Sequence, residues 1–540
     1  MRRMRNEQLE HDRQQRVSRL RAQRAQARAA AEQHRAAGRR AEAGARWLDG
    51  RLPFLDAGKG LLRKIFPDHW SFLLGELALY SFALLMLTGV YLTFFFKPAM
   101  REVVYSGSYA PLRGLRVTEA YASTLTISFD VRGGLLIRQL HHWAALVFLA
   151  AIGAHMMRVF FTGAFRRPRE MNWLIGLTLF QLALVEGFAG YSLPDDLLSG
   201  TGLRTAQGFM LAVPLVGSYL SFFAFGSEWP GQDIIPRLYT THVLLLPGLM
   251  LGLVTAHLIL VFYLKHTQWG GPGRSGRNVV GQPMFPQFLA KTGGLAFMVF
   301  GLLALLAAVA QVNPIWNYGP YRADQASTDA QPDWYMGFLE GALRLMPGTE
   351  TQALGHTISW NPLIPAVLFP LVLFMALYAY PFVEQWITGD RSEHHLCDRP
   401  RNRPTRTAIG VAGLTAYAVL LLAGAQDIVA YKFDTSVNTL NWTLRIALFV
   451  APFLAFHLTR YLCLALQSRD RTRLTTGTPT GFVHQSVEGA FRQSHDPLTP
   501  SQKYTLTLDP PPAPLAPADP SRRERVRAAL SDWYYRDRVH

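Results

Sequence analysis

The chain has 540 residues, of which 49% are hydrophobic and 12% aromatic, and its formal net charge at pH 7 is +17. Most of the hydrophobic residues lie in long apolar blocks, which excludes a string of soluble domains and indicates a polytopic membrane protein. The positive charge lies in tails and short loops rather than in a basic surface, so nucleic-acid binding is not expected.

Residues 1–50 are rich in Arg, Ala and Gln and contain no apolar core. A cleavable signal peptide would need an apolar stretch directly after a short basic start, so none is expected. The segment is a solvated tail, a helix lying on anionic headgroups, or a binding site for another subunit. Aromatic residues are not interleaved with the bases, so the segment does not indicate RNA binding.

Eight apolar stretches are long enough to cross roughly 30 Å of hydrocarbon as helices, at about 1.5 Å per residue. They cover residues 72–96, 139–162, 172–193, 238–264, 292–311, 361–382, 407–425 and 440–464. The loops after the second, fourth and sixth stretches are rich in Arg and Lys, and the opposite loops carry more acidic residues. The positive-inside rule therefore places both termini in the cytoplasm. We expect an all-α membrane protein.

Two of the stretches carry histidine pairs. His141 and His155 are 14 residues apart in the second stretch, and His242 and His257 are 15 apart in the fourth. A 14-residue step falls about 40° short of four turns and a 15-residue step about 60° past them, so each pair shares one helix face. Side by side, these helices offer two histidine–histidine clamps at two depths, as two bis-histidine haems require. For a lone intramembrane histidine, the alternative is a satisfied polar group or a proton relay.

Two further residues of these stretches affect the geometry. His142 lies 13 residues before His155, about 140° off the ligand face, and is expected to be structural rather than a ligand. Pro247, between His242 and His257, is expected to bend its helix and to let the 15-residue step meet the 14-residue one.

Glycines recur at the histidine interval on the first and third stretches. Gly75 and Gly89 are 14 residues apart, as are Gly176 and Gly190. Glycine in a membrane helix normally serves close helix packing. Their repetition on the helices that alternate with the histidine helices favours a second role, clearance for two flat macrocycles against the backbone. The first four stretches are therefore predicted to form a four-helix bundle around two stacked haems.

Several motifs together identify a family. The glycine and histidine pairs, Arg138-Gln139-Leu140-His141 and Pro332-Asp333-Trp334-Tyr335 resemble cytochrome b of the respiratory and photosynthetic cytochrome bc and bf complexes, over roughly residues 65 to 465. The 15-residue step and Gly190-Tyr191-Ser192-Leu193-Pro194 are similar to the photosynthetic branch and its bacterial relatives. The unsplit chain with long polar tails is similar to the actinobacterial form.

The resemblance implies the membrane subunit of a quinol–cytochrome c reductase in a bacterial plasma membrane. A quinol, expected to be menaquinol, would be oxidised at the outer face. One electron would pass to a Rieske iron–sulfur subunit and on to a cytochrome c subunit. The second would cross two non-covalent b-type haems, held by His141 with His242 outside and His155 with His257 inside, to an inner quinone site. Proton translocation, a homodimeric complex and a haem–copper oxidase as a further partner follow from the same resemblance.

The motif Pro332-Asp333-Trp334-Tyr335 resembles the family's quinol-site motif, which most often has Glu in the second place. A carboxylate beside an aromatic wall can take protons from a bound hydroquinone, so Asp333 is the candidate base and Tyr335 its hydrogen-bonding partner. Aspartate is one methylene shorter than glutamate, so its reach towards the quinol differs. The alternative is that Asp333 only caps a helix.

Basic residues near the histidines have two interpretations each. Arg138, Arg158 and Arg237 could bind haem propionates through their guanidinium forks, or they could extend to the membrane interface. Lys265 and His266, directly after the fourth stretch, could supply protons to the inner quinone site, or they could belong to the basic flank.

The chain is expected to divide into four regions. These are a basic cytoplasmic tail (1–66), the di-haem bundle with its outer loops (67–265), the C-terminal helices with the quinol-site loop (266–464) and a Pro-rich cytoplasmic tail (465–540). Cys397 and Cys463 are isolated, so disulfides and an iron–sulfur centre of the chain's own are not expected. Two other functions remain open: a di-haem anchor of a quinone-linked dehydrogenase, and a proton-coupled transporter.

Overall fold

The computed structural model describes residues 62–325, 331–353, 355–508, 514–516 and 521–535, with isolated positions before residue 62. Most of the tail expected over residues 1–66 lies outside these residues. The chain divides into two compact units, and the smaller one holds the residues up to Phe66 together with Gln282–Ala290. In the smaller unit, β1 (Ile65–Phe66) pairs antiparallel with β5 (Gln282–Pro283), and Phe66 stacks on Phe288 of η4 (Met284–Phe288).

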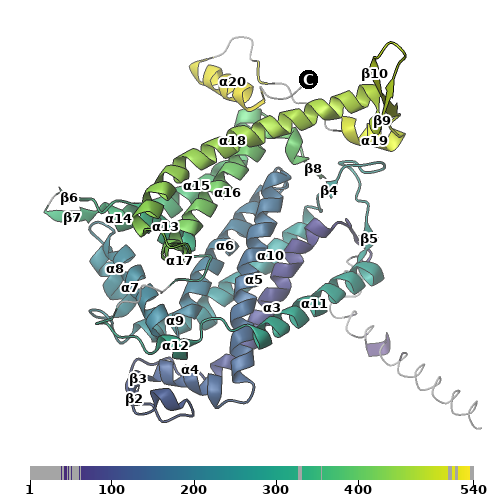
Figure 1. Cartoon of the computed structure of the whole chain (residues 1–540). Coiled ribbons are helices and arrows are strands. Elements are labelled where there is room, and N and C mark those ends of the chain that lie inside the picture. Colours follow the sequence, from purple (N-terminus) through teal and green to yellow (C-terminus); the bar gives the residue numbers. More distant parts are fainter. Residues whose placement is uncertain are drawn as a thin grey trace, which may run out of the picture. The chain divides into compact units, whose positions relative to one another are not determined.

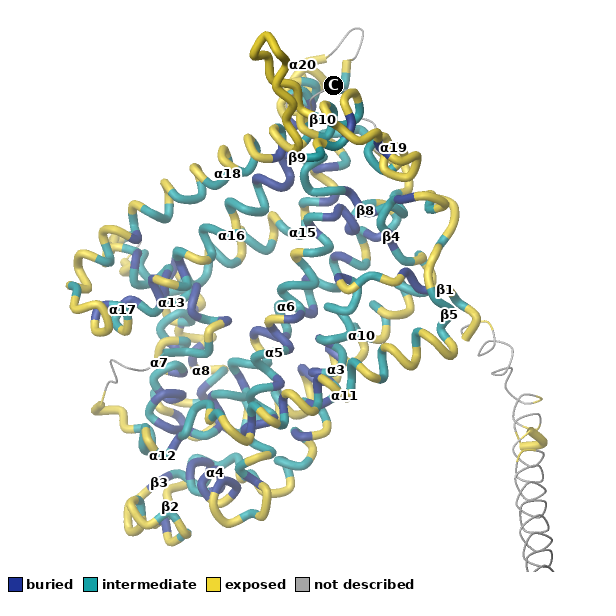
Figure 2. Tube along the Cα trace, turned by 45° about the vertical axis from the view of Figure 1, so that its right-hand side comes forward, coloured by how far each residue is buried: buried dark blue, intermediate teal, exposed yellow. Residues whose placement is uncertain are grey.

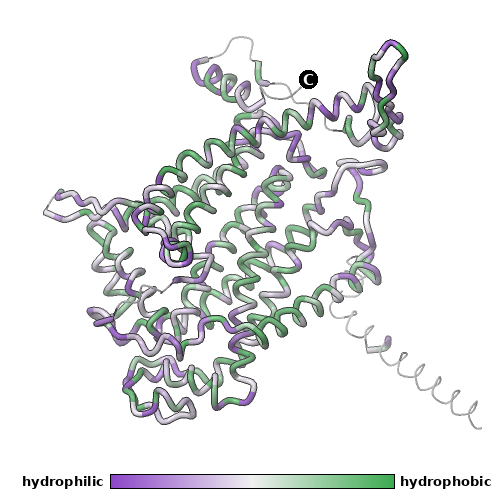
Figure 3. Tube along the Cα trace, in the orientation of Figure 1, coloured by the Kyte–Doolittle hydropathy of each residue, from purple (hydrophilic) through white to green (hydrophobic). Residues whose placement is uncertain are grey.

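The prediction of eight membrane spans is confirmed. Among the described residues, eight helices are long and apolar enough to cross a membrane. Their main helices are α3 (Leu73–Thr93), α5 (Gly134–Phe161), α6 (Glu170–Tyr191), α10 (Leu246–Tyr263), α11 (Leu289–Val309), α15 (Phe369–Thr388), α16 (Pro404–Gly424) and α18 (Val437–Thr476). Hydrophobic residues run along these helices (Figure 3), because a helix in lipid satisfies its backbone internally and presents apolar side chains outward.

The first four spans of the larger unit, α3, α5, α6 and α10, pack as the predicted bundle (Figure 1). The 3₁₀ turn η1 (Trp70–Phe72) opens the first of them. Phe82, Phe148, Leu179 and Met250, one from each helix, are buried in a common core, and Phe82 stacks on Phe148 with ring centroids 5.5 Å apart. The bundle therefore brings the glycine helices and the histidine helices together.

A π-turn, η3 (Thr241–Leu245), interrupts the fourth span at the first of its histidines. It lies between α9 (Ile234–Thr240) and α10, and the N–H of Leu246 bonds to the carbonyl of Thr241, an i→i+5 bond. Pro247 has no N–H to donate, which favours the wider turn. A π-turn accommodates about one extra residue. The 15-residue step along this span thereby matches the 14-residue step on α5. The sequence predicts a bend at Pro247, and the structure has a π-turn beside it instead.

Short elements connect the first five spans at the end of the bundle where α5 begins. They are β2 (Glu102–Val104), η2 (Ala110–Leu112), β3 (Arg116–Thr118), α4 (Glu119–Phe129), α7 (Leu197–Leu211), α8 (Gly217–Phe225) and α12 (Ile315–Tyr318). Strands β2 and β3 pair antiparallel. Thr118 caps α4 and donates from its hydroxyl to Asp195 at 2.8 Å, which joins the connection after the first span to the one after the third.

The second half of the chain packs against the third span. Besides α15, the elements between α12 and α16 are α13 (Gly337–Leu345), β6 (Glu350–Ala353), β7 (His356–Ser359), α14 (Trp360–Pro362), η5 (Leu363–Leu368), β8 (Leu396–Cys397) and η6 (Pro400–Asn402). Strands β6 and β7 form a hairpin, and β8 pairs parallel with β4 (Gln268–Trp269). The indole of Trp173 on α6 donates to the carbonyl of Leu377 on α15 at 2.9 Å, which fixes α15 against the bundle.

The last span, α18, is longer than the predicted stretch 440–464. Between residue 464 and Gly477 the chain is polar but contains no glycine or proline, so the helix continues until Gly477, whose φ of 94° ends it. Residues along α18 are mostly exposed or half-buried (Figure 2). The chain then forms the hairpin of β9 (Thr478–Gln485) and β10 (Phe491–Asp496), followed by α19 (Pro500–Thr507) and α20 (Arg522–Tyr535). Between α16 and α18 lies α17 (Gln426–Lys432).

Helix α20 closes over a buried group of charges that we call the Arg406 cluster: Arg166, Glu384, Asp398, Arg403, Arg406 and Tyr534. Arg406 is fully buried and bonds to Glu384 at 3.0 Å and to Asp398. The hydroxyl of Tyr534 on α20 also donates to Glu384. Burial alone would raise the pKa of Asp398, but the charges of Arg403, Arg166 and Arg406 outweigh it and hold the pKa well below its usual range. Asp398 therefore stays charged, and the cluster ties α15, α16 and α20 together.

We expect Arg406→Met to destabilise the protein by about 3–5 kcal/mol, because it removes the cation that pairs with the buried carboxylate of Glu384, whereas Asp398 keeps Arg166 and Arg403. Arg322→Ala is the matched control, since Arg322 pairs with Asp324 on the surface and such pairs contribute at most about 1 kcal/mol. Thermal unfolding of the purified protein measures both. Equal melting temperatures for the two variants would show that the cluster does not stabilise this end of the fold.

Candidate functional site

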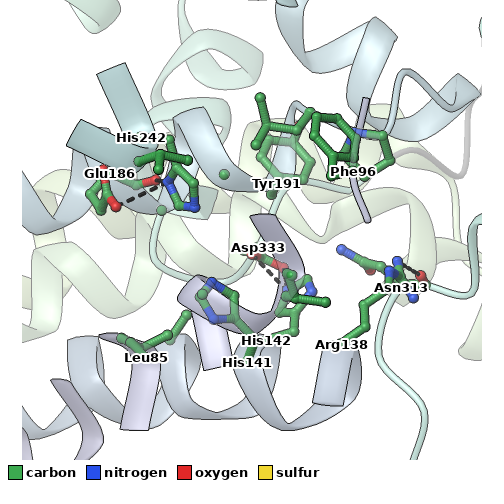
Figure 4. A pocket seen from close by; sticks show the side chains of 18 of the residues that line it. Leu85, Phe96, Arg138, His141, His142, Glu186, Tyr191, His242, Asn313 and Asp333 are labelled. Carbon is green, nitrogen blue, oxygen red and sulfur yellow. Dashed lines mark hydrogen bonds and ion pairs between the residues drawn. The ribbon is translucent and has the colours of Figure 1, made fainter. Parts of the chain in front are cut away.

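The first ring pair joins α5 to the π-turn of the fourth span. The ring centroids of His141 and His242 are 6.1 Å apart. Nδ1 of His141 lies 2.8 Å from the hydroxyl of Thr88, which itself donates to the carbonyl of Leu84. Nδ1 of His242 lies 3.2 Å from the carbonyl and 3.0 Å from the carboxylate of Glu186 (Figure 4). With both Nδ1 atoms engaged in hydrogen bonds, Nε2 of each ring remains for a metal.

The second ring pair, His155 of α5 and His257 of α10, lies one step further along the bundle. Its ring centroids are 6.4 Å apart. An iron bound at about 2 Å by one nitrogen of each of two imidazoles, each nitrogen about 1 Å from its ring centre, would separate the centroids by about 6 Å. Both ring pairs fit that spacing, so the residues present fit two bis-histidine haems.

Each predicted glycine lies against one of these four histidines. A Cβ added at Gly75 would lie 3.1 Å from the ring of His155, and one added at Gly89 would lie 3.3 Å from the ring of His141. At Gly176, the distance to the His257 ring would be 3.7 Å, and at Gly190 a Cβ would collide with the His242 ring. The glycine helices therefore provide space for the imidazoles themselves. The sequence had suggested clearance for the macrocycles.

Two of the three predicted arginines have free donors inside the bundle. Arg138 donates from Nη2 to the carbonyl of Asn313 at 2.8 Å, and its buried Nη1 has no hydrogen-bond partner among the described residues. Arg158 lies over the ring of Phe72, with its Nε buried and without a partner in the same part of the chain. Such unpaired donors suit carboxylates of a bound group.

The third arginine is placed elsewhere. Arg237 is exposed, forms an ion pair with Asp233 at 3.1 Å and does not line the cavity beside the first ring pair.

A cavity of about 300 Å³ adjoins the first ring pair. Its walls come from α3, α5, α6, the fourth span and the connection before α13. His141, His242, Arg138, Asp333 and Tyr335 all line it, and Figure 4 shows several of these side chains around one space. The cavity thus brings the predicted quinol motif to the first ring pair.

In this cavity the Asp333 carboxylate is held on two sides. The phenol of Tyr335 donates to Oδ2 at 3.1 Å, as the sequence suggested. Burial, and then the nearby Asp333 charge, raises the pKa of Tyr335 well above its usual value, so the phenol keeps its proton. Gly187 on α6 makes room for this ring, since a Cβ there would lie 2.5 Å from the phenol oxygen of Tyr335 and 2.8 Å from its Cζ. Trp334 is partly exposed, and Pro332 is half-buried beside it.

His142 is the side chain on the other side. Its Nε2–H donates to both oxygens of Asp333, at 3.1 Å and 3.0 Å. His142 thus lies away from the ring pairs, as its spacing from His155 predicts, and its partner Asp333 is 191 residues further along the chain. The sequence feature that could have indicated this contact is His142 itself, a second intramembrane histidine on a different face of the same helix.

The two residues proposed for an inner quinone site lie after α10. Lys265 is exposed, with a positive φ of 64°, and its carbonyl accepts from Nε of Arg169 at 3.2 Å. His266 is half-buried. Neither lines the cavity beside the first ring pair.

Comparison with known proteins agrees with this geometry. A family model described as cytochrome b (N-terminal)/b6/petB matches residues 146–320. The chain is 56% identical, with 91% of each chain covered, to the cytochrome bc1 complex cytochrome b subunit of Streptomyces coelicolor. It is 49% identical to the protein of that name from Mycobacterium tuberculosis, over 87% of this chain and 85% of the other. Among solved structures, a chain of a hyperthermophilic respiratory Complex III shares the fold, with a TM-score of 0.58, 20% identity and coverage of 77% and 98%.

Proposed function

Because this chain belongs to the family of cytochrome b subunits of cytochrome bc1 complexes, we propose that its ring pairs hold two b-type haems and that Asp333 serves quinol oxidation. The chain is the membrane subunit of a quinol–cytochrome c oxidoreductase, a component of respiratory electron transport. Membership of this family does not favour the two other functions, a dehydrogenase anchor and a transporter.

The observation that carries the haem proposal is the pair of ring spacings, 6.1 Å and 6.4 Å, with a glycine behind each ring. When bound, the haems would supply one-electron transfer between the two faces of the membrane, a distance of about 30 Å that is too long for one hop. Arg138 and Arg158 would bind propionates through their unpaired donors. Thr88 and Glu186 would keep the imidazoles of the first ring pair oriented.

At the cavity, the chain's own residues would bind the quinol and take its protons. A hydroquinone hydroxyl within reach of Asp333 can transfer its proton to the carboxylate, which acts as the general base. The Tyr335 phenol, which keeps its proton, holds Oδ2 of that carboxylate in place. The lining of the cavity, which includes Phe82, Phe148 and Met250, is largely apolar. It suits the macrocycle between the rings of the first pair and, on the side of Asp333 and Tyr335, the ring of a quinol such as menaquinol.

We infer the orientation from charge. The loops at the end of the bundle away from the cavity are rich in arginine, so this end faces the cytoplasm of a bacterial plasma membrane. These arginines are Arg166, Arg167, Arg169, Arg391, Arg399, Arg401 and Arg403. Helix α20 lies at the same end, which supports a cytoplasmic C-terminus. A second quinone site is proposed at this end near Lys265 and His266, which follow the helix of His257.

The partners are other subunits of the complex and the lipid membrane. Of these we propose a Rieske iron–sulfur subunit and a cytochrome c subunit as the electron acceptors on the outer side, with a haem–copper oxidase beyond them. The two cysteines of the chain, Cys397 and Cys463, are both buried and free, so neither belongs to a disulfide. Assembly as a homodimeric complex is part of the same proposal.

We expect Gly190→Val to weaken haem binding at the first ring pair and Gly75→Val to weaken it at the second. Each new side chain would enter the space of one imidazole, and overpacking of this kind costs about 1–3 kcal/mol, or roughly 5- to 150-fold in affinity. The b-type absorbance of each purified variant measures the loss. Gly153→Val is the matched control, since a Cβ at Gly153 meets nothing within 4 Å. Full haem content in the first two variants would contradict the assignment of the glycines.

We expect Asp333→Asn to slow quinol oxidation by roughly 10²- to 10⁴-fold, the usual contribution of a general base, while both haems stay bound. The measurement is quinol-dependent cytochrome c reduction by the whole complex. Asp324→Asn serves as the control, because Asp324 lies in the same connection but is exposed. Unchanged turnover in Asp333→Asn would remove this carboxylate from the mechanism.

A further inference from the structure

The Asp333 carboxylate has two hydrogen-bonding neighbours, and one of them belongs to the helix of the first ring pair. His142 of α5 donates to both carboxylate oxygens, and Tyr335 donates to one. The side chains of His142 and Asp333 are only 15% and 8% exposed, so this pair is largely shielded from solvent. A hydrogen bond to a charged group in such surroundings is stronger than one at the surface.

We propose that His142 is a positioning residue for quinol oxidation, which holds the Asp333 carboxylate at the place where it accepts the proton. The inference rests on the proposed function, since it assigns a role to a neighbour of the general base. Tyr335 alone fixes one oxygen and leaves the carboxylate free to rotate about its bond to Cβ. The contacts from Nε2 of His142 to both oxygens remove that freedom, because the carboxylate then faces one direction.

The position of His142 in α5 explains how this helix contacts both the His242 ring and the Asp333 carboxylate. Consecutive residues of an α-helix point about 100° apart. His141 therefore faces the ring of His242, while His142 faces Asp333, as the side chains in Figure 4 show. Any shift of α5 moves both together, so the base keeps its distance from the first ring pair. This link between the ring pair and the base requires that the residue next to His141 carry a hydrogen-bond donor as far from the backbone as Nε2 of histidine.

An ion pair that only stabilises the fold would show the same contacts as a positioning residue. Variants that differ in side-chain length distinguish these two roles. The amide nitrogen of glutamine lies as far from the backbone as Nε2 of histidine, and that of asparagine stops about one bond short. His142→Gln and His142→Asn are thus alike in polarity and differ in whether they reach Asp333. His457, an exposed histidine of α18 whose ring contacts Phe453 and Phe456, provides the control His457→Asn.

The test is steady-state quinol oxidation by the whole complex, with the b-type absorbance recorded for every variant. We expect His142→Asn to lower kcat by about 10- to 100-fold, the effect of a displaced catalytic group, with a smaller change in KM. His142→Gln should recover most of the rate, and His457→Asn should match the native protein. The double variant His142→Asn/Asp333→Asn should be no slower than Asp333→Asn alone, because His142 acts through Asp333.

Several results would overturn the proposal. A native kcat in His142→Asn, equal losses in the Gln and Asn variants, or multiplied losses in the double variant would each exclude positioning of Asp333. A slow Asp333→Asn together with a native His142→Asn would overturn this inference alone. Native rates in Asp333→Asn would overturn both it and the assigned base.

Discussion

The structure depends on two pairs of imidazoles that face each other between two neighbouring spans. The two pairs are separated by 14 residues along one span and by 15 along the other. Each ring has a partner across the bundle and a glycine behind it, and the rings of the first pair also have orienting hydrogen bonds. The helices of the glycine pairs supply the space, since a Cβ at Gly190 would enter the ring of His242. At the first ring pair, Thr88 and Glu186 supply the orienting contacts. The four helices are thus mutually constrained, and no one of them can rotate without losing a ring pair.

The same constraint explains the irregularity of the fourth span. A regular helix would turn His257 away from His155 if His242 faced His141, because the two steps differ by one residue. The π-turn at Thr241–Leu245, beside Pro247, takes up that residue. π-turns are rare and are frequently found at functional sites. Here the turn places the ring of one histidine in the cavity that also contains the Asp333 carboxylate.

Much of this could be predicted from the sequence, because it depends on local periodicity. The eight spans follow from apolar length, and the ring pairs follow from the number of residues per turn. The partners of the glycines and the contact between His142 and Asp333 could not be predicted, because they depend on how helices rotate and on residues 191 positions apart. The length of α18 was underestimated because hydropathy does not detect a polar continuation of a helix. The Arg406 cluster also joins distant segments, so no pattern in the sequence indicates it.

A redox titration of the purified, detergent-solubilised complex, followed through the b-type absorbance, tests whether both ring pairs hold haem. Two one-electron components of equal amplitude and distinct midpoint potential are expected, since the two pairs differ in depth and in their neighbouring charges. A single component, or folded protein without b-type absorbance, would contradict the assignment of His141, His155, His242 and His257 as the ligands of two haems.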